Sequence, residues 1–539
     1  KMIEDRVDEE LDIHIADSRF SHAHAISQIV TTNHGRLEKT VSDRIDKMVL
    51  SRLFGIPIFL AVMYLMFMFA INIGGAFIDF FDGVAGALFV DGLGHLLSGW
   101  GLPDWLVVLL ADGAGGGVQV VATFIPIITA LYLFLSVIED SGYMARAAFV
   151  MDRFMRSIGL PGKAFVPMIV GFGCNVPAVM ATRTLESDRE RKLTILMNPF
   201  MSCGARLPVY VLFAAAFFPQ SGQNLVFGLY LIGIVVAILT GLIMKKTLLS
   251  GESAGFMMEL PHYHMPTLRG VLLRTWDRVK LFIKEAGQVI VLMVLLINTL
   301  NSIGTDGSFG NEDTEHSVLS AVSKTVTPVL SPMGISEDNW PATVGVFTGI
   351  LAKETVVGTL DALYTNLAND EAGIEPQHDV FDFWRAISAA AATVPENLLG
   401  VKDLITDPLA LDVGDISNAQ VVAEEQAINL GVFGAMAARF DGQAGAFAYL
   451  LFILLYSPCV ATIGAIRREA GSRWAAFVVA WSTGVAYVSA SLFYQLSTYD
   501  SHPDSGLYWV IALIGILVAT IAGLRFWSLR DQANRGVEA

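Results

Sequence analysis

The stretch between residues 167 and 208 limits the possible folds of this chain more than any other part of the sequence. It contains two apolar segments, PMIVGFGCNVP and NPFMSCGARLP, which Pro and Gly interrupt and which each carry one Cys. Pro removes an amide donor and clashes with the preceding helical turn, and Gly loosens the backbone. Non-helical backbone persists within a bilayer only where it is buried in protein or lines a cavity. We therefore expect two broken helices that face an internal path.

The composition indicates that the surroundings of these segments are a membrane. Of 539 residues, 54% are hydrophobic and 16% are charged, whereas a soluble protein carries about 25% charged residues. Several apolar runs reach the roughly 20 residues that a helix needs to cross a bilayer. We predict an all-α polytopic membrane protein whose surrounding partner is membrane lipid. The net charge of −16 argues against a nucleic-acid partner, since such partners attract basic surfaces.

The apolar runs and the basic residues beside them predict eight spans with both termini in the cytoplasm. The expected spans cover about residues 53–73, 118–139, 193–218, 225–244, 286–303, 447–466, 474–496 and 507–527. Residues 74–117 contain no Lys or Arg, so we expect them outside, as a helix in the interface followed by a Gly-rich turn at 113–117.

In two further apolar segments, the charges of the flanking residues place both ends of the segment on the same side of the membrane. Residues 164–182 lie between basic residues, which predicts a re-entrant hairpin from the cytoplasm. Residues 341–364 are apolar around Lys353 and Glu354 and precede an acidic stretch, which predicts re-entry from the outer face. Each half then reads span, re-entrant segment, broken span, span. Because the halves start from opposite faces, we expect an inverted repeat with the substrate near the midplane.

The same pattern divides the chain into five parts. The expected parts are a cytoplasmic helical lead-in (1–50), a first membrane half (51–244), a cytoplasmic amphipathic linker (245–284), a second membrane half (285–530) with a polar external insert at about 367–430, and a cytoplasmic tail (531–539).

The three cysteines are the first candidates for chemistry. All lie in apolar segments beside Pro or Gly, and their odd number argues against a disulfide framework. Sulfur ligands suit soft and borderline metals, and nearby oxygen atoms can complete such a site. The alternatives are that each Cys is a small apolar residue and each Met a core filler. The candidate metal ligands are Cys174, Cys203, Cys459, Asn175, Met201, Ser202 and Ser457.

The Lys353–Glu354 pair is the second signal. A charge at the bilayer centre costs about 2.5–3.5 kcal/mol on insertion scales, so it normally faces a cavity or a partner. Glu354 is a further candidate metal ligand, and Lys353 could hold a counter-ion or move as a gate. The alternative is a structural ion-pair network.

A third charged group closes the second expected span. Glu139, Asp140 and Arg146 form either an acidic exit cluster or a helix-end salt-bridge network. We find no Walker motif and no nucleophile–base arrangement in the sequence, so we expect no catalytic site in this chain.

Five motifs resemble the signature of the ferrous iron transport protein B family. They are EDSGYMARAAFVMD (139–152), GFGCNVPAVMATRTL (171–185), PFMSCGARLPVY (199–210), LAKETVVG (351–358) and YSPCVAT (456–462). The resemblance extends from about residue 10 to residue 530. It implies a bacterial inner-membrane Fe(II) uptake protein with two gate-type halves related to nucleoside transporters. It also implies that Cys174, Cys203 and Cys459 lie on or near the iron path.

Family members also carry an N-terminal G domain, which hydrolyses GTP with Mg(II), and a helical regulatory domain. The G motifs are absent from this sequence, and residues 1–40 resemble only the end of the helical domain. GTP and Mg(II) are therefore expected for the parent protein. The resemblance also implies the protein's own G domain and small cytosolic accessory proteins of the ferrous iron uptake system as partners, and it is compatible with a homo-oligomer.

Three rival functions stay open at this point. One is a gate-fold transporter of nucleosides, and another is a transporter of Mn(II) or Zn(II), which the same ligands would bind. The third is a membrane scaffold that anchors a cytosolic GTPase without transporting anything.

Overall fold

The computed structural model describes residues 11–30, 41–51, 53–249, 251, 261–351, 353–372, 382–404, 420, 422–423, 429, 431–500 and 503–537. The chain divides into two compact units, residues 1–51 and 52–539. The first unit contains helices α2 (Leu11–Val30) and α3 (Val41–Val49). The apolar side chains Phe20, Ile29 and Val30 of α2 are exposed.

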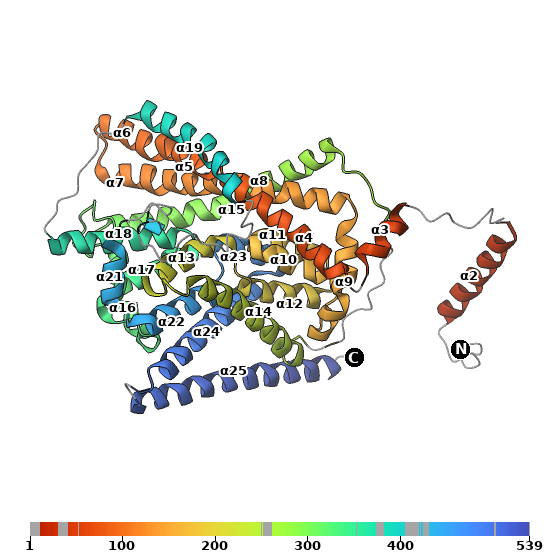
Figure 1. The fold of residues 1–539 in the computed structure, drawn as a ribbon. Coiled ribbons are helices and arrows are strands. Elements are labelled where there is room, and N and C mark those ends of the chain that lie inside the picture. Colours follow the sequence, from red (N-terminus) through yellow and green to blue (C-terminus); the bar gives the residue numbers. More distant parts are fainter. Residues whose placement is uncertain are drawn as a thin grey trace. The chain divides into compact units, whose positions relative to one another are not determined.

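The second unit is a bundle of helices (Figure 1). Its first half contains α4 (Gly55–Met68), η1 (Phe69–Ile73), α5 (Ile78–Ala85), η2 (Gly86–Asp91), α6 (Gly92–Gly99), α7 (Asp104–Val107), η3 (Val108–Gly115), α8 (Gly116–Asp140), α9 (Tyr143–Ile158), η4 (Gly162–Ala164), α10 (Phe165–Gly173), α11 (Asn175–Ala181), η5 (Thr182–Thr184), α12 (Asp188–Met197), η6 (Asn198–Phe200), η7 (Gly204–Arg206), α13 (Leu207–Phe217) and α14 (Gly222–Lys246).

The second half contains α15 (Leu268–Ser302), α16 (Val318–Leu330), η8 (Ser331–Met333), η9 (Glu337–Asn339), α17 (Trp340–Leu351), α18 (Thr355–Ala372), α19 (Phe383–Leu404), α21 (Gly431–Arg439), α22 (Gly442–Leu455), α23 (Val460–Ala470), α24 (Ser472–Ser497) and α25 (Pro503–Val537). Within the described ranges, β structure is limited to two isolated bridges.

Eight helical segments of the described chain are long and apolar enough to cross a membrane. They are Gly55–Gly99, Asp104–Asp140, Asp188–Phe217, Gly222–Lys246, Leu268–Ser302, Gly442–Ala470, Ser472–Ser497 and Gly506–Phe526. Each contains or overlaps one of the eight expected spans, so the prediction of an all-α multi-pass membrane protein is confirmed. The two segments with internal breaks, Asp188–Phe217 and Gly442–Ala470, are the most enclosed, with 72% and 83% of their apolar windows buried. The broken segments therefore form the centre of the bundle.

The expected order of elements recurs in the two halves. In the first half α8 is followed by the short pair α10–α11, the broken segment α12–α13 and the full helix α14; in the second, α15 is followed by α17–α18, α22–α23 and α24. The halves pack reciprocally, because α11 contacts α23 and α18 contacts α13. Each short helix pair thus reaches the broken segment of the other half.

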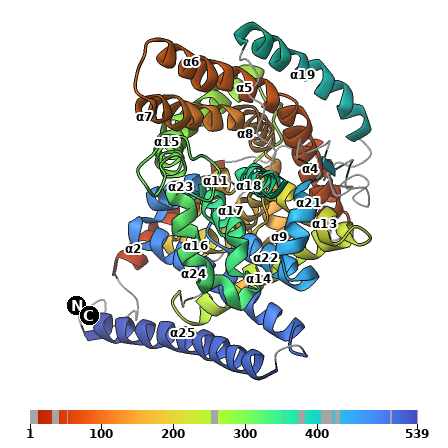
Figure 2. The ribbon, with the colours of Figure 1, turned by 90° about the vertical axis from the view of Figure 1, so that its left-hand side faces the viewer.

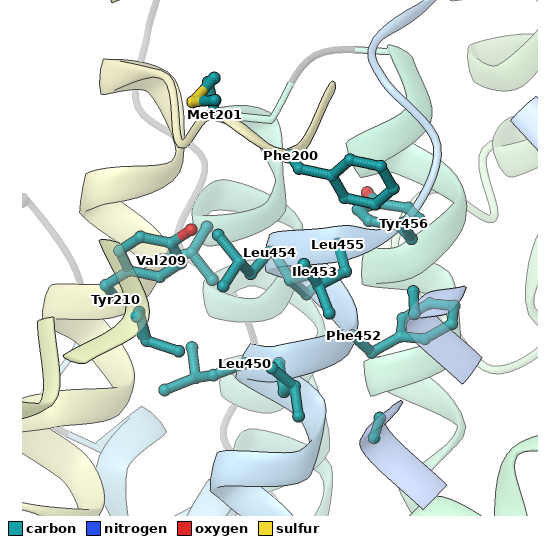
Figure 3. Packing of buried hydrophobic residues seen from close by; sticks show 14 of the residues in the cluster. Phe200, Met201, Val209, Tyr210, Leu450, Phe452, Ile453, Leu454, Leu455 and Tyr456 are labelled. Atoms are coloured by element: carbon teal, nitrogen blue, oxygen red, sulfur yellow. The ribbon is translucent and has the colours of Figure 1, made fainter. Parts of the chain in front are cut away.

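One core cluster joins the two broken segments (Figure 3). The side chains of Phe200 and Tyr210 come from the first broken segment, and those of Leu450, Leu454 and Tyr456 come from the second; all are 1% exposed or less. Apolar contact between these segments fixes the position of the backbone breaks that each segment carries.

The Gly-rich turn expected at residues 113–117 is wrong, because these residues are helical. η3 ends at Gly115 and α8 begins at Gly116. A Cβ atom on Gly117 would lie 2.8 Å from the Cα atom of Val291, and one on Gly113 would lie 2.8 Å from Leu295 Cδ1. Small residues let membrane helices approach closely, so Gly113 of η3 and Gly117 of α8 allow these two elements to pack against α15.

The expected linker and the expected insert are partly helical in the residues that the structure describes. The second part of the linker is continuous with the following span, because α15 is one helix from Leu268 to Ser302. The insert contributes α19, which packs on α5, with Asn397 Nδ2 donating to Asp79 Oδ2 at 2.7 Å (Figures 1 and 2). The rest of the expected insert falls largely at 373–381 and 405–430, mostly outside the described residues. The expected tail begins inside α25, which extends to Val537.

Candidate functional site

Four breaks in the helices define the candidate site, two from each half. The first break is Cys174, which separates α10 from α11 with extended backbone angles of φ −154° and ψ 130°. Its amide donates to the Val170 carbonyl, so the thiol lies where α10 ends. With its amide nitrogen turned toward these acceptors, Asn175 donates to the carbonyl groups of Asn198 at 3.1 Å and Gly171 at 3.2 Å. Asn175 therefore connects the first break to the second.

The second break covers residues 198–206 and holds Cys203 in an extended conformation. Arg206 is fully buried, and its guanidinium donates to the carbonyl groups of Pro199 at 3.2 Å and Met201 at 3.4 Å. The carbonyls left free where the helix is interrupted thus receive a cationic donor. Two other expected ligands at this break already have neighbours. The Ser202 hydroxyl is hydrogen-bonded to the Tyr210 hydroxyl at 2.9 Å, and Met201 belongs to the core cluster.

The third break lies between α17 and α18 and carries Lys353 and Glu354. Lys353 is 3% exposed, and its Nζ donates to the Ser457 carbonyl at 2.8 Å. The same ammonium lies 3.2 Å from the centroid of the Tyr456 ring. A cation–π contact of this kind compensates part of the cost of burying the charge. Lys353 therefore connects the third break to the fourth, as Asn175 connects the first to the second.

The fourth break covers residues 456–459, between α22 and α23. Cys459 is extended, with φ −61° and ψ 156°, and its Sγ lies 3.2 Å from Thr462 Oγ1. The hydroxyl of Ser457 donates to the Pro458 carbonyl at 3.2 Å, while the carbonyl of Ser457 accepts from Lys353. The backbone at this break is thus bonded to a buried cation next to a partly accessible thiol.

The four breaks converge in space. Cys174 is within electrostatic range of Cys203, Cys459 and Glu354. Cys203 is within the same range of Cys459, Lys353, Glu354 and Arg206. All three thiols are free and partly accessible. The structure thus brings Cys174 and Cys459 near each other, although they are 285 positions apart in the sequence.

Two cavities meet at the fourth break. A cavity of about 290 Å³ is lined by Asp82, Asn298, Thr348 and Thr355, and a second of about 550 Å³ lies between α11, α15 and α23. Val460, which follows Cys459, lines both cavities. The third and fourth breaks therefore lie beside both cavities, the smaller of which contains several polar side chains.

The Cys and Glu residues among the expected ligands are not grouped as in a compact metal centre in the described part of the chain. Within the described part of the chain, no group of three or more His, Cys, Asp or Glu side chains is arranged to hold a metal ion. The three thiols are near one another without sharing one coordination sphere. This arrangement suits successive, incomplete contacts along a path better than a resident structural metal, which takes four fixed ligands when it is zinc.

Ion pairs connect the end of α8 to α15. Glu139 accepts from Arg278 at 2.7 Å, and Asp140 pairs with Arg274. Arg146 is buried, donates to the Gly142 carbonyl at 2.9 Å and stacks on an aromatic ring. These contacts favour the salt-bridge alternative for the group that closes the second span.

Two further pairs join the halves and the linker helix. Arg183, which follows α11, pairs with Glu469 near the end of α23, and Arg468 pairs with Glu285 of α15. Sequence reasoning missed these partners, and it also missed Arg206 as the residue that bonds the second break. The only signal for Arg206 is a basic residue inside an apolar segment.

Two family models match parts of this chain. A family model described as Gate: Nucleoside recognition matches residues 121–217 and 283–473. A second, described as Ferrous iron transport protein B C terminus, matches residues 226–278. No solved structure matches the chain.

Two curated relatives align with nearly the whole sequence. The Fe(2+) transporter FeoB of Legionella pneumophila strain Paris is 47% identical over 520 residues, which cover 96% of this chain and 68% of the relative. The Fe(2+) transporter FeoB of Salmonella typhimurium strain LT2 is 44% identical over 532 residues, which cover 96% of this chain and 66% of the relative.

Proposed function

This chain belongs to the ferrous iron transport protein B family, and from that premise we propose that it carries Fe(II) across the bacterial inner membrane past its four helix breaks. The family models and the relatives support ferrous iron transport. The observation that supports this particular route is the convergence of the breaks, because all three cysteines of the chain lie at them.

The proposed route begins in the smaller cavity of about 290 Å³. Asp82 and Asn298 supply oxygen atoms there, and oxygen ligands suit a hydrated divalent cation. At the breaks the ion meets Cys459, Cys203 and Cys174 in turn, with Glu354 and the free carbonyl groups as oxygen ligands. Thiols bind metal as thiolates, so each contact releases a proton.

In the absence of the ion, Lys353 and Arg206 would occupy the positions that the ion takes during transport. Each cation occupies backbone carbonyls that a metal ion could otherwise bind. A divalent ion that reaches the breaks competes for these carbonyls and repels the ammonium of Lys353. We infer that Lys353 moves as the gate, and that its displacement opens the way into the larger cavity.

The test is uptake of radioactive Fe(II) into anaerobic proteoliposomes. Replacing Cys174, Cys203 and Cys459 one at a time by Ser should lower the initial rate about 10- to 100-fold, the range seen when a metal site loses a supporting group. Ser482→Ala is the matched control, because this hydroxyl donates to the carbonyl of Val479 in its own helix and to no other acceptor among the described residues. Uptake at the wild-type rate by all three Ser variants would disprove the thiol route.

A second measurement reports on contact with the ion directly. In chains that retain one Cys each, Fe(II), Mn(II) and Zn(II) should slow alkylation of the remaining thiol. Comparing the three metals gives the selectivity, which the ligand types alone do not settle because Zn(II) binds sulfur more tightly than Fe(II). If no metal protects any thiol, the proposed ligands are wrong.

The rival substrate is a nucleoside, which the description of the gate family model favours. A nucleoside would require aromatic and amide groups around a base, with the thiols incidental. Uptake of labelled nucleoside by the same vesicles, insensitive to the Ser substitutions, would support this rival. Uptake of Fe(II) without nucleoside would reject it.

Regulation and orientation complete the proposal. We propose that a GTPase domain of the parent protein, with GTP and Mg(II), controls the path, and that small cytosolic accessory proteins assist it. We also propose that both termini face the cytoplasm, as the positive-inside rule requires. Addition of GTP to vesicles that contain the complete protein should change the rate of Fe(II) uptake; an unchanged rate would reject the control by nucleotide.

A further inference from the structure

Asn198 presents a polar side chain at the second break that the route described above does not use. It is fully buried, and neither its Nδ2 nor its Oδ1 atom has a hydrogen-bond partner among the residues that the structure describes. Its backbone carbonyl, in contrast, accepts from the backbone amide of Met201 at 3.0 Å and from the side-chain amide of Asn175. The main chain of Asn198 is therefore held in place, while its side chain has no hydrogen-bond partner within the described part of the chain.

An unpaired buried amide lowers the stability of a folded protein, since it has lost its hydrogen bonds to water. Such groups are rare in native proteins and call for a specific explanation, such as a bound ion or a functional role. Leu would avoid this loss with a side chain of similar size. The presence of Asn at a fully buried position therefore indicates a use for the amide itself.

The surroundings of this amide indicate what it binds. A Cβ atom on Gly171 would lie 2.9 Å from Asn198 Oδ1 and 3.3 Å from Met201 Cβ, so the amide oxygen points at the surface of α10 where that helix lacks a side chain. Cys174 follows Gly171 by three residues, about one helical turn. The oxygen thus reaches α10 one turn before the thiol that ends it.

We propose that the Asn198 side chain is an oxygen ligand for the transported divalent cation at the first and second breaks, beside Cys174. This inference rests on the proposed function. An amide oxygen next to a thiol makes a mixed site, which suits a borderline ion such as Fe(II) better than sulfur alone. Gly171 is the residue that leaves room for the amide to face α10.

The decisive variant is Asn198→Leu, because the two roles that an unpaired amide can have predict opposite results. An ion ligand predicts that Fe(II) uptake falls about 10- to 100-fold while the thermal midpoint stays equal or rises, since an unsatisfied polar group has been removed. Fe(II) should also no longer protect Cys174 from alkylation. Wild-type uptake, or a loss of uptake together with a lowered midpoint, would overturn the proposal and assign Asn198 a purely structural role.

Two further variants separate this inference from a general folding defect. Gly171→Ala keeps the amide but displaces it from α10, and it should reproduce the loss of uptake and of Cys174 protection. Asn339→Leu is the matched control: Asn339 is also fully buried, but its Oδ1 accepts from the Tyr364 hydroxyl, so its loss should lower the midpoint and leave uptake per folded protein unchanged. An equal loss of uptake in this control would overturn the assignment to Asn198.

The comparison with Cys174→Ser separates the two proposals. Loss of uptake in Cys174→Ser but not in Asn198→Leu refutes the oxygen ligand alone. Wild-type uptake in both refutes the route past the first break as well.

Discussion

The ion pair between Arg183 and Glu469 offers a direct test of how the two halves are held together. Arg183 Nε donates to Glu469 Oε1 at 2.7 Å, and its Nη2 lies 2.5 Å from the same oxygen. The residues belong to different halves and are 286 positions apart. Glu469 raises the pKa of the Arg183 guanidinium through this hydrogen bond, so the guanidinium stays charged at neutral pH.

The strength of this pair follows from its unequal burial. The side chain of Arg183 is 48% exposed and that of Glu469 is 6% exposed. Exposed pairs contribute about 0.2–1 kcal/mol, and breaking a buried pair costs about 3–5 kcal/mol. Because solvent screens one partner only, Arg183→Gln should cost about 2 kcal/mol. At about 2.1 cal/mol/K per residue, a chain of 539 residues would lose about 2 °C in Tm.

The assay is a double-mutant cycle in detergent, with Arg183→Gln, Glu469→Gln and both together. The double variant should be little less stable than either single variant, which gives a coupling free energy of about 2 kcal/mol. Residues that do not interact give additive effects within about 0.3–0.5 kcal/mol, and an additive result here would refute the reasoning. We also expect the single variants to leak Fe(II) from loaded vesicles, because the pair connects the tip of α11 to α23.

Three further predictions test other parts of the structure. Lys353→Met should speed the alkylation of Cys459 and increase the leak of Fe(II) from loaded vesicles, because the fourth break loses its bond to the cation that closes the path; an unchanged alkylation rate would contradict this role. Gly117→Leu should cost about 1–3 kcal/mol in the free energy of unfolding, as overpacking does, since a side chain there meets the backbone of α15; unchanged stability would contradict the close contact. Burial raises the pKa of the Asp313 carboxyl above 3.8, so its contribution to the free energy of unfolding is fully present below that value and is lost as the pH rises through the raised pKa. Asp313→Asn keeps an oxygen for the hydrogen bond from Asn301 and should remove this part of the pH dependence in thermal unfolding; an identical dependence in the variant would refute it.

The breaks can be predicted because their cause is local. An apolar run in lipid must satisfy its backbone within a helix, and Pro or Gly beside a Cys marks where this fails. These neighbours are enough to place the extended backbone at Cys174 and Cys203. The eight spans have an equally local cause, since each is an apolar run of sufficient length.

The partners of those breaks depend on contacts between distant segments. A Lys inside an apolar segment predicts a buried charge, but the acceptor of Lys353, the carbonyl of Ser457, lies 104 residues away. In the sequence, Arg206 and Asn198 are ordinary members of an apolar motif, because neither burial nor the loss of a hydrogen-bond partner can be read from neighbouring residues.

Short stretches of this chain specify where it crosses the membrane, where its helices break and which atoms lie at the breaks. Each of these follows from a residue and its near neighbours in a solvent that offers no hydrogen bonds. Three other features arise only from contacts in the folded structure: the use of the glycines at 113–117 in a helix contact instead of a turn, the cations that bond the broken backbone, and the buried amide that has no hydrogen-bond partner among the described residues. The physical reason is that packing depends on which segments become neighbours in the fold. Gly117 meets Val291 and Lys353 meets Ser457, and each of these partners is more than a hundred residues away in the sequence.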